Sequence, residues 1–232
     1  MIDYSEGILW YIVFLFSTTL HEASHAFTAM KMGDLTAYES GQVSLSPIPH
    51  VKREPLGTVV IPVISFLIGG WMIGWASAPY DPEWAYKHPK KSAAMAAAGP
   101  ISNFILVILS ALLIHIGIYF GIFYAPETIT TGSVVEAVNP GFFESAAKIL
   151  SIMFSLNLIL LFFNLIPVPP LDGSGIIPMF LSEETGRKYM KVVSNSAFAL
   201  IGILIAWKLF DLVYFNIHTV FINLLYPGSN YQ

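Results

Sequence analysis

Long runs of apolar residues constrain this chain more than any other feature. They cover residues 8–30, 57–75, 92–119, 144–166 and 192–215. A helix needs roughly 20 apolar residues to cross the hydrocarbon core of a bilayer, and most of these runs approach or exceed that length. Charged residues make up only 11% of the chain, whereas a soluble domain carries about 25%. The sequence therefore predicts an all-α polytopic membrane protein, with one membrane-embedded domain over residues 1–232.

The basic residues indicate how the helices cross the membrane. We expect four crossing helices, at 8–30, 92–119, 144–166 and 192–215. The run at 57–75 is broken by Pro62 and by Gly69-Gly70, which favours a re-entrant segment that returns to the side it left. Most of the basic residues then share one side, which should be the cytosol, with both termini outside. These residues are Lys31, Lys52, Arg53, Lys87, Lys90, Lys91, Arg187, Lys188 and Lys191.

The polar stretch 35–51 has a different pattern. Val43 and Leu45 alternate with polar residues on either side, and a period of two is typical of a β-strand. We therefore expect a short β-hairpin around Gly41 on the cytosolic side. His50 follows in a proline-rich loop on the side of the candidate functional site. It could act near the site, but we expect an exposed side chain.

The strongest chemical signal is His21-Glu22-Ala23-Ser24-His25, inside the first apolar run. Two histidines at positions i and i+4 of a helix lie one turn apart on the same face and can bind one zinc ion. Glu22 is then placed to act as the general base toward water. A chance pair of histidines is the alternative. Ionisable groups inside a membrane segment are costly and usually functional, which argues against chance here.

A catalytic zinc site requires a third protein ligand. The chain has no cysteine, so this ligand must be a histidine or a carboxylate. Asp172 is the candidate because it follows the run 144–166 after a proline-rich stretch that cannot form a regular helix. Gly173 would allow this turn to approach its neighbours closely. The alternative is an exposed Asp172 in a loop that merely ends a helix.

A second polar position lies near the start of the run 92–119. Gly99 allows close helix contact, and Asn103 lies one turn further along the same face. The amide of Asn103 could hold a substrate carbonyl or stabilise an oxyanion. Interhelical hydrogen bonding without a catalytic role is an equally good interpretation.

Together these motifs resemble the site-2 protease family of intramembrane zinc metalloproteases. The resemblance rests on HEASH in a membrane helix, on the GxxxN pattern from Gly99 to Asn103, and on Asn164-Leu165-Ile166-Pro167 leading to Leu171-Asp172-Gly173. The stretch from Gly33-Asp34 to His50 is similar to a short prokaryotic branch. About two dozen residues separate the runs 92–119 and 144–166, which leaves no room there for a PDZ domain, and we expect no CBS domain either.

The resemblance implies a site and a function. It implies one Zn²⁺ held by His21, His25 and Asp172, with Glu22 as the general base and Asn103 as a helper in substrate binding or transition-state stabilisation. It also implies cleavage of transmembrane or membrane-proximal segments of other membrane proteins, with the active site nearer the cytosolic side of the cell membrane.

Other functions fit part of the pattern. The expected partners are a membrane-protein substrate and the lipid bilayer, whereas a net charge of −4 argues against nucleic acid. A housekeeping protease would share the chemistry and differ in substrate. A metal-binding membrane adaptor or transporter without hydrolysis is the main alternative, and Glu22 argues against it because a transporter needs no general base. The complete set of four residues also argues against a pseudoprotease. The sequence does not indicate an oligomeric state.

Overall fold

The computed structural model describes residues 4–194 and 196–231, and most of them are helical. The long helices are α1 (Tyr4–Met32), α6 (Pro89–Tyr119), α7 (Phe142–Asn164) and α10 (Ser196–Leu225). The shorter ones are α2 (Thr36–Glu39), α3 (Pro47–Arg53), the π-helix η1 (Leu56–Val60), α4 (Ile61–Gly69), α5 (Pro82–Lys87), α8 (Asp172–Ile176), the 3₁₀-helix η2 (Ile177–Phe180) and α9 (Glu183–Val193).

Two helices in the described part of the chain are long and apolar enough to cross a membrane. These are α6 and α7, and a third crossing results if α9 and the first part of α10, which meet at 90°, form one broken span. Helix α1 has sufficient length, but HEASH interrupts its apolar sequence. The structure therefore supports a mainly helical membrane protein with two to three candidate spans.

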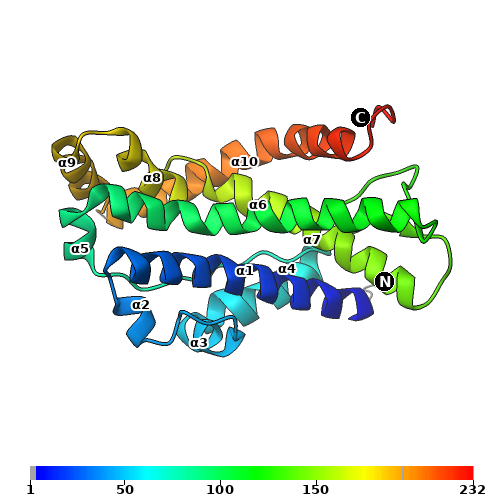
Figure 1. Ribbon diagram of the computed structural model, residues 1–232, viewed down its shortest axis with the longest axis horizontal. Helices are drawn as coiled ribbons and strands as arrows, with labels where there is room; N and C mark the ends of the chain where they lie inside the picture. Colours follow the sequence, from blue (N-terminus) through cyan, green and yellow to red (C-terminus); the bar gives the residue numbers. More distant parts are fainter. Residues whose placement is uncertain (1–3, 195, 232) are drawn as a thin grey trace.

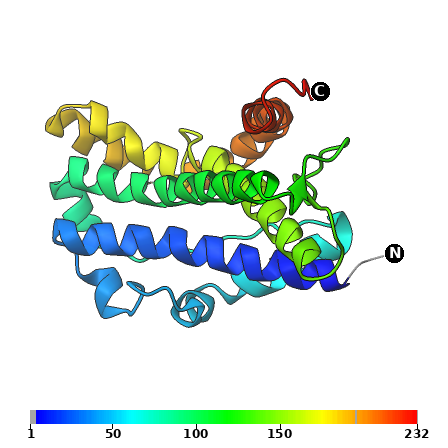
Figure 2. The same cartoon turned by 45° about the vertical axis from the view of Figure 1, so that its right-hand side comes forward.

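The long helices form a bundle (Figure 1). Helices α1 and α6 lie side by side and run in opposite directions, and the described part of the chain begins and ends at the end of the bundle remote from α5 and α9 (Figures 1 and 2). Helix α7 packs against α6 and α1. One apolar cluster joins α1, α4 and α7 around Trp10, Phe14 and Leu156. These contacts hold α1, α4 and α7 together.

The chain after α3 enters the bundle and leaves it at the same end. Helix α4 reaches far along α1, where the ring of Phe66 packs against Gly7. The chain turns at Gly70 and returns over residues 72–80, which have no regular secondary structure. Arg53 Nε donates to Ser77 Oγ over 3.1 Å, so the start and the end of this excursion lie side by side. The bend occurs at the predicted glycine pair.

Asp34 ties this returning chain to the end of α1. Its Oδ1 accepts hydrogen bonds from the backbone N and Oγ1 of Thr36, and its Oδ2 accepts one of 2.9 Å from the backbone N of Asp81. Burial acts to raise the pKa of the Asp34 carboxyl, but the three hydrogen bonds outweigh it and hold the pKa below its usual value. A charged carboxylate therefore fixes the point where α1 meets the segment that leads to α5.

The predicted hairpin around Gly41 is wrong. Residues 35–51 form α2, a turn and the start of α3, and residues 42–46 are irregular. The alternation misled because Gln42 is buried whereas Leu45 is 66% exposed, the reverse of a strand with an apolar inner face. Ser46 caps α3 and Pro47 occupies its first turn, a combination that starts a helix. The described two-stranded sheet instead pairs β1 (Phe123–Tyr124) with β2 (Glu136–Ala137), between α6 and α7.

Candidate active site

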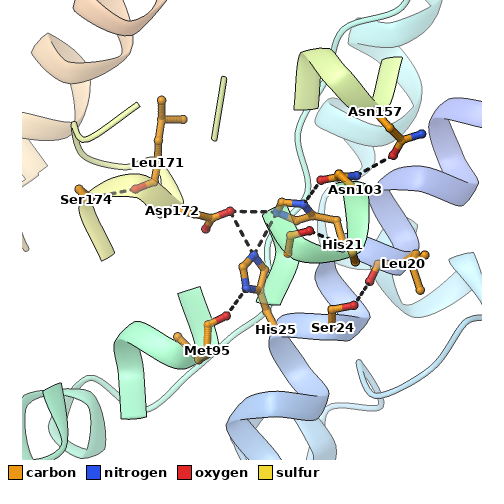
Figure 3. A network of polar contacts seen from close by, with 12 residues as sticks. Leu20, His21, Ser24, His25, Met95, Asn103, Asn157, Leu171, Asp172 and Ser174 are labelled. Carbon is orange, nitrogen blue, oxygen red and sulfur yellow. Dashed lines mark hydrogen bonds and ion pairs between the residues drawn. The ribbon is translucent and has the colours of Figure 1, made fainter. Parts of the chain in front are cut away.

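Three side chains from distant parts of the chain meet at one point (Figure 3). The Nε2 atoms of His21 and His25 lie 3.0 Å apart, and Oδ2 of Asp172 lies 3.0 Å from the first and 3.3 Å from the second. Among the described residues, this is the group of His, Asp and Glu side chains whose donor atoms converge tightly enough to hold one metal ion. Both histidines are buried, and Asp172 is 20% exposed at its side chain.

Helix α1 supplies both imidazoles because positions 21 and 25 lie one turn apart on the same face. That face is turned to α6, where Gly99 leaves room for the rings. A Cβ atom at Gly99 would overlap with Nε2 of both His21 and His25. The absence of a side chain at this position therefore creates the space in which the two nitrogen atoms meet.

The third side chain comes from the turn after α7. Asp172 is the first residue of α8, and the next residue, Gly173, packs directly on the backbone carbonyls of Leu165 and Ile166. A Cβ at Gly173 would overlap with both carbonyl oxygens. The chain therefore folds back tightly on the end of α7, and this turn directs the Asp172 carboxylate toward α1 (Figure 3).

The hydrogen bonds behind the imidazoles set their tautomers. Nδ1 of His25 lies 2.7 Å from the backbone O of Met95, which can only accept, so this nitrogen carries the proton. Nδ1 of His21 lies 2.6 Å from Oδ1 of Asn103 and is a donor in the same way. Both Nε2 atoms then present lone pairs to each other and to the carboxylate of Asp172.

This arrangement fits a zinc ion. Oδ2 of Asp172 is buried and has no hydrogen-bond partner in the described part of the chain. Three lone-pair atoms facing one another repel unless a cation lies between them. Ligand atoms at about 2.0–2.1 Å from a tetrahedral zinc are about 3.3 Å apart, close to the separations here. Two imidazoles and one carboxylate are also a common protein ligand set of catalytic zinc.

The other two predicted site residues lie beside this group. Glu22 is buried and follows His21 on α1. Asn103 is fully buried, and both of its polar atoms are engaged: Oδ1 with His21, and Nδ2 as a donor to Oδ1 of Asn157 over 2.8 Å. Asn157 on α7 was not among the predicted residues. An asparagine in an otherwise apolar membrane run is a signal that could have identified it.

A groove of about 540 Å³ opens next to the site, between α1 and α6. Its walls are mostly apolar, residues 43–45 form one border, and the polar residues of the lining are Ser24, Thr28, Ser44 and Ser102. Within the described chain, no backbone N–H of residues 43–45 donates a hydrogen bond. The groove therefore combines a mostly apolar lining with a bordering segment whose backbone N–H groups are unpaired in the described chain.

The exposed side chain expected for His50 is a wrong prediction. His50 is 1% exposed, and its Nε2 lies 3.1 Å from the backbone O of Ser44. The His50 side chain therefore holds residues 43–45, which border the groove, against α3. Sequence reasoning missed this because the proline-rich stretch forms helix α3, which packs against α1.

Comparison with known proteins gives the family. A sequence model of peptidase family M50 matches residues 9–209, which is most of the chain. This chain belongs to peptidase family M50. The predicted resemblance to the site-2 protease family is thereby confirmed. The match includes every residue of the candidate site. No solved structure matches the chain.

Similar proteins carry names that describe a zinc enzyme. "Putative zinc metalloprotease YwhC" of Bacillus subtilis is 34% identical over 167 residues, covering 72% of this chain and 66% of the relative. Rip2 of Mycolicibacterium smegmatis, named in the same way, is 28% identical over 173 residues, covering 75% of this chain and 57% of the relative. Rip2 of Mycobacterium tuberculosis is 27% identical over 191 residues, covering 82% and 63%. The chain spans about two thirds or less of the length of these relatives.

Proposed function

We propose that this protein is an intramembrane zinc metalloprotease that hydrolyses peptide bonds in transmembrane or membrane-proximal segments of other membrane proteins. One observation carries the proposal: Nε2 of His21, Nε2 of His25 and Oδ2 of Asp172 converge within 3.0–3.3 Å, with lone pairs facing inward. Membership of peptidase family M50 and the names of the relatives support the same activity.

His21, His25 and Asp172 would hold the zinc, with Glu22 adjacent. When bound there, the ion would supply Lewis-acid chemistry toward the peptide carbonyl and the attacking water. Glu22 accepts a proton from the attacking water and passes it to the nitrogen of the departing peptide. Asn103 acts through His21, because both polar atoms of its amide are occupied and the side chain is shielded from the groove.

The substrate must present an unwound peptide, because a helix hides its carbonyls in hydrogen bonds. The groove between α1 and α6 has the apolar lining that a membrane segment needs. Residues 43–45 are irregular and have free backbone donors. We propose that an extended substrate pairs with this segment by backbone hydrogen bonds, as in β-strand addition.

The membrane topology is part of the proposal. Four crossings by α1, α6, α7 and α10, with residues 56–80 as a re-entrant segment, keep most basic residues at one end of the bundle. Contacts at this end support the grouping: Lys91 Nζ donates to the backbone O of Met32 over 3.2 Å, and α5 packs against α9. The positive-inside rule makes this end cytosolic. The metal site is then nearer the cytosol, because His25 lies close to the end of α1.

We expect single cysteines at Arg53 and Asp81 to react with a membrane-impermeant thiol reagent only from the cytosolic side. The protein has no cysteine of its own, so labelling has no background. Glu127→Cys, in the exposed connection between α6 and α7, is the control and should react only from outside. Labelling of Asp81→Cys from outside, with Arg53→Cys labelled from the cytosol, would show that residues 56–80 cross the membrane.

We expect His21→Ala and Asp172→Ala to purify with less than about a tenth of the wild-type zinc, because two ligands alone do not hold a catalytic zinc. Metal analysis of the protein in detergent measures this directly. His115→Ala is the matched control, since His115 is exposed on α6 far from the site. Full zinc occupancy of Asp172→Ala would remove that carboxylate from the ligand set.

A further inference from the structure

A chain of buried hydrogen bonds runs from the candidate metal site into α7. Asn103 Oδ1 accepts from His21 Nδ1 over 2.6 Å, and Asn103 Nδ2 donates to Asn157 Oδ1 over 2.8 Å. Asn157 Nδ2 donates in turn to Ser17 Oγ over 3.0 Å and to the backbone O of Met153 over 2.8 Å. Asn103, Asn157 and Ser17 are each fully buried. Figure 3 shows the two asparagines in line behind His21.

The hydrogen bond at the far end of this series, from Asn157 to Met153, determines the orientation of every amide and imidazole in it. A backbone carbonyl can only accept, so the side-chain atom of Asn157 next to Met153 O must be the NH₂ group. Its Oδ1 therefore faces Asn103 and requires a donor there, which is Nδ2. The remaining atom of Asn103, Oδ1, then faces His21 and requires a proton on Nδ1. The lone pair of His21 is left on Nε2, toward His25 and Asp172.

We infer that Asn157 is a positioning residue for the metal site. It prevents the Asn103 amide from rotating by half a turn, and thereby keeps His21 in the tautomer that can bind zinc. Without Asn157, a rotated Asn103 would present its NH₂ group to Nδ1, and the proton of the imidazole would move to Nε2. This inference rests on the proposed ligand role of His21. It adds a residue of α7 to a site otherwise built from α1, α6 and α8.

The test measures zinc affinity by competition with a soluble chelator, on the full chain purified in detergent. Asn157→Leu keeps the side-chain size and removes the acceptor of Asn103. Loss of an outer partner of a ligating histidine typically weakens metal binding about 10- to 100-fold, and we expect about 10-fold for this more remote residue. Asn157→Ala also lacks the acceptor and gives the same test if the leucine variant does not fold.

A double variant separates positioning from a general loss of stability. In an Asn103→Ala background, the Asn157 substitution should cause no further loss of affinity, because the group it orients is already gone. Ser151→Ala is the matched control. Ser151 is fully buried on the same helix and hydrogen-bonded to the backbone of Val134 and Val135, and its loss should leave zinc affinity unchanged in both backgrounds.

The possible outcomes are distinct. Wild-type affinity in both Asn157 variants, or an equal loss with and without Asn103, would overturn the inference and leave Asn157 as a packing residue. Wild-type zinc affinity in His21→Ala would instead overturn the proposed ligand set. A loss in His21→Ala combined with no change in the Asn157 variants would reject this inference alone.

Discussion

A Glu22→Gln variant should bind zinc like the wild type and cleave peptide bonds at least about 10²–10⁴-fold more slowly. Glutamine has nearly the same size as glutamate but cannot accept the proton of the attacking water, and general acid–base catalysis contributes rate factors of this order. The three side chains that meet at the site are untouched by the change. Parallel measurements of zinc content and of substrate cleavage in vesicles test both parts.

The same variant distinguishes the protease from a transporter. A membrane protein that only binds or moves the metal would function normally with glutamine at position 22. Glu22→Gln should also retain uncut substrates, and membrane proteins that co-purify with it but not with the Asp172→Ala variant are substrate candidates. Turnover within about tenfold of wild type would exclude Glu22 as the general base.

Gly99→Ala should also be damaging, but through zinc binding rather than proton transfer. The added methyl group would occupy the space between the two Nε2 atoms. Forcing one methyl into filled space costs about 1–3 kcal/mol, which is roughly 5- to 150-fold in affinity if the imidazoles bear the strain. We expect a corresponding loss of zinc affinity and of cleavage.

Gly186→Ala is the control for this prediction. Gly186 lies in α9, remote from the site, and the nearest atom to an added Cβ would be Cβ of Pro89 at 3.1 Å. Zinc affinity in this variant should equal that of the wild type. Unchanged affinity in Gly99→Ala as well would mean that α6 can move away from α1 without disturbing the histidines.

The parts of the site that depend on local sequence were predictable. The spacing of His21 and His25 follows from the helix repeat, and the prolines before Asp172 required irregular backbone there. The glycine pair Gly69-Gly70 also predicted where the segment bends. In each case a few adjacent residues carry the physical constraint.

The predictions that the structure did not confirm concern features that depend on how the helices pack against one another. Nothing near Asn103 in the sequence says whether its amide faces the groove or His21, because the rotation of α6 against α1 and α7 decides this. The alternation at 42–46 suggested a strand, but these residues are irregular, α3 begins directly after them at Pro47, and packing against α1 buries His50. Short polar segments take their structure from such tertiary contacts more than from their own pattern.

The separation of the ligands along the chain has a consequence for biogenesis. His21 and His25 are made early, whereas Asp172 follows after more than half of the chain. At about 5–20 residues per second, the ribosome finishes Asp172 roughly 7–30 s later. A nascent chain therefore carries two of the three proposed ligands before the third exists. If the proposed ligand set is correct, zinc cannot be held by the complete site until the turn that carries Asp172 has been made and has docked against α1.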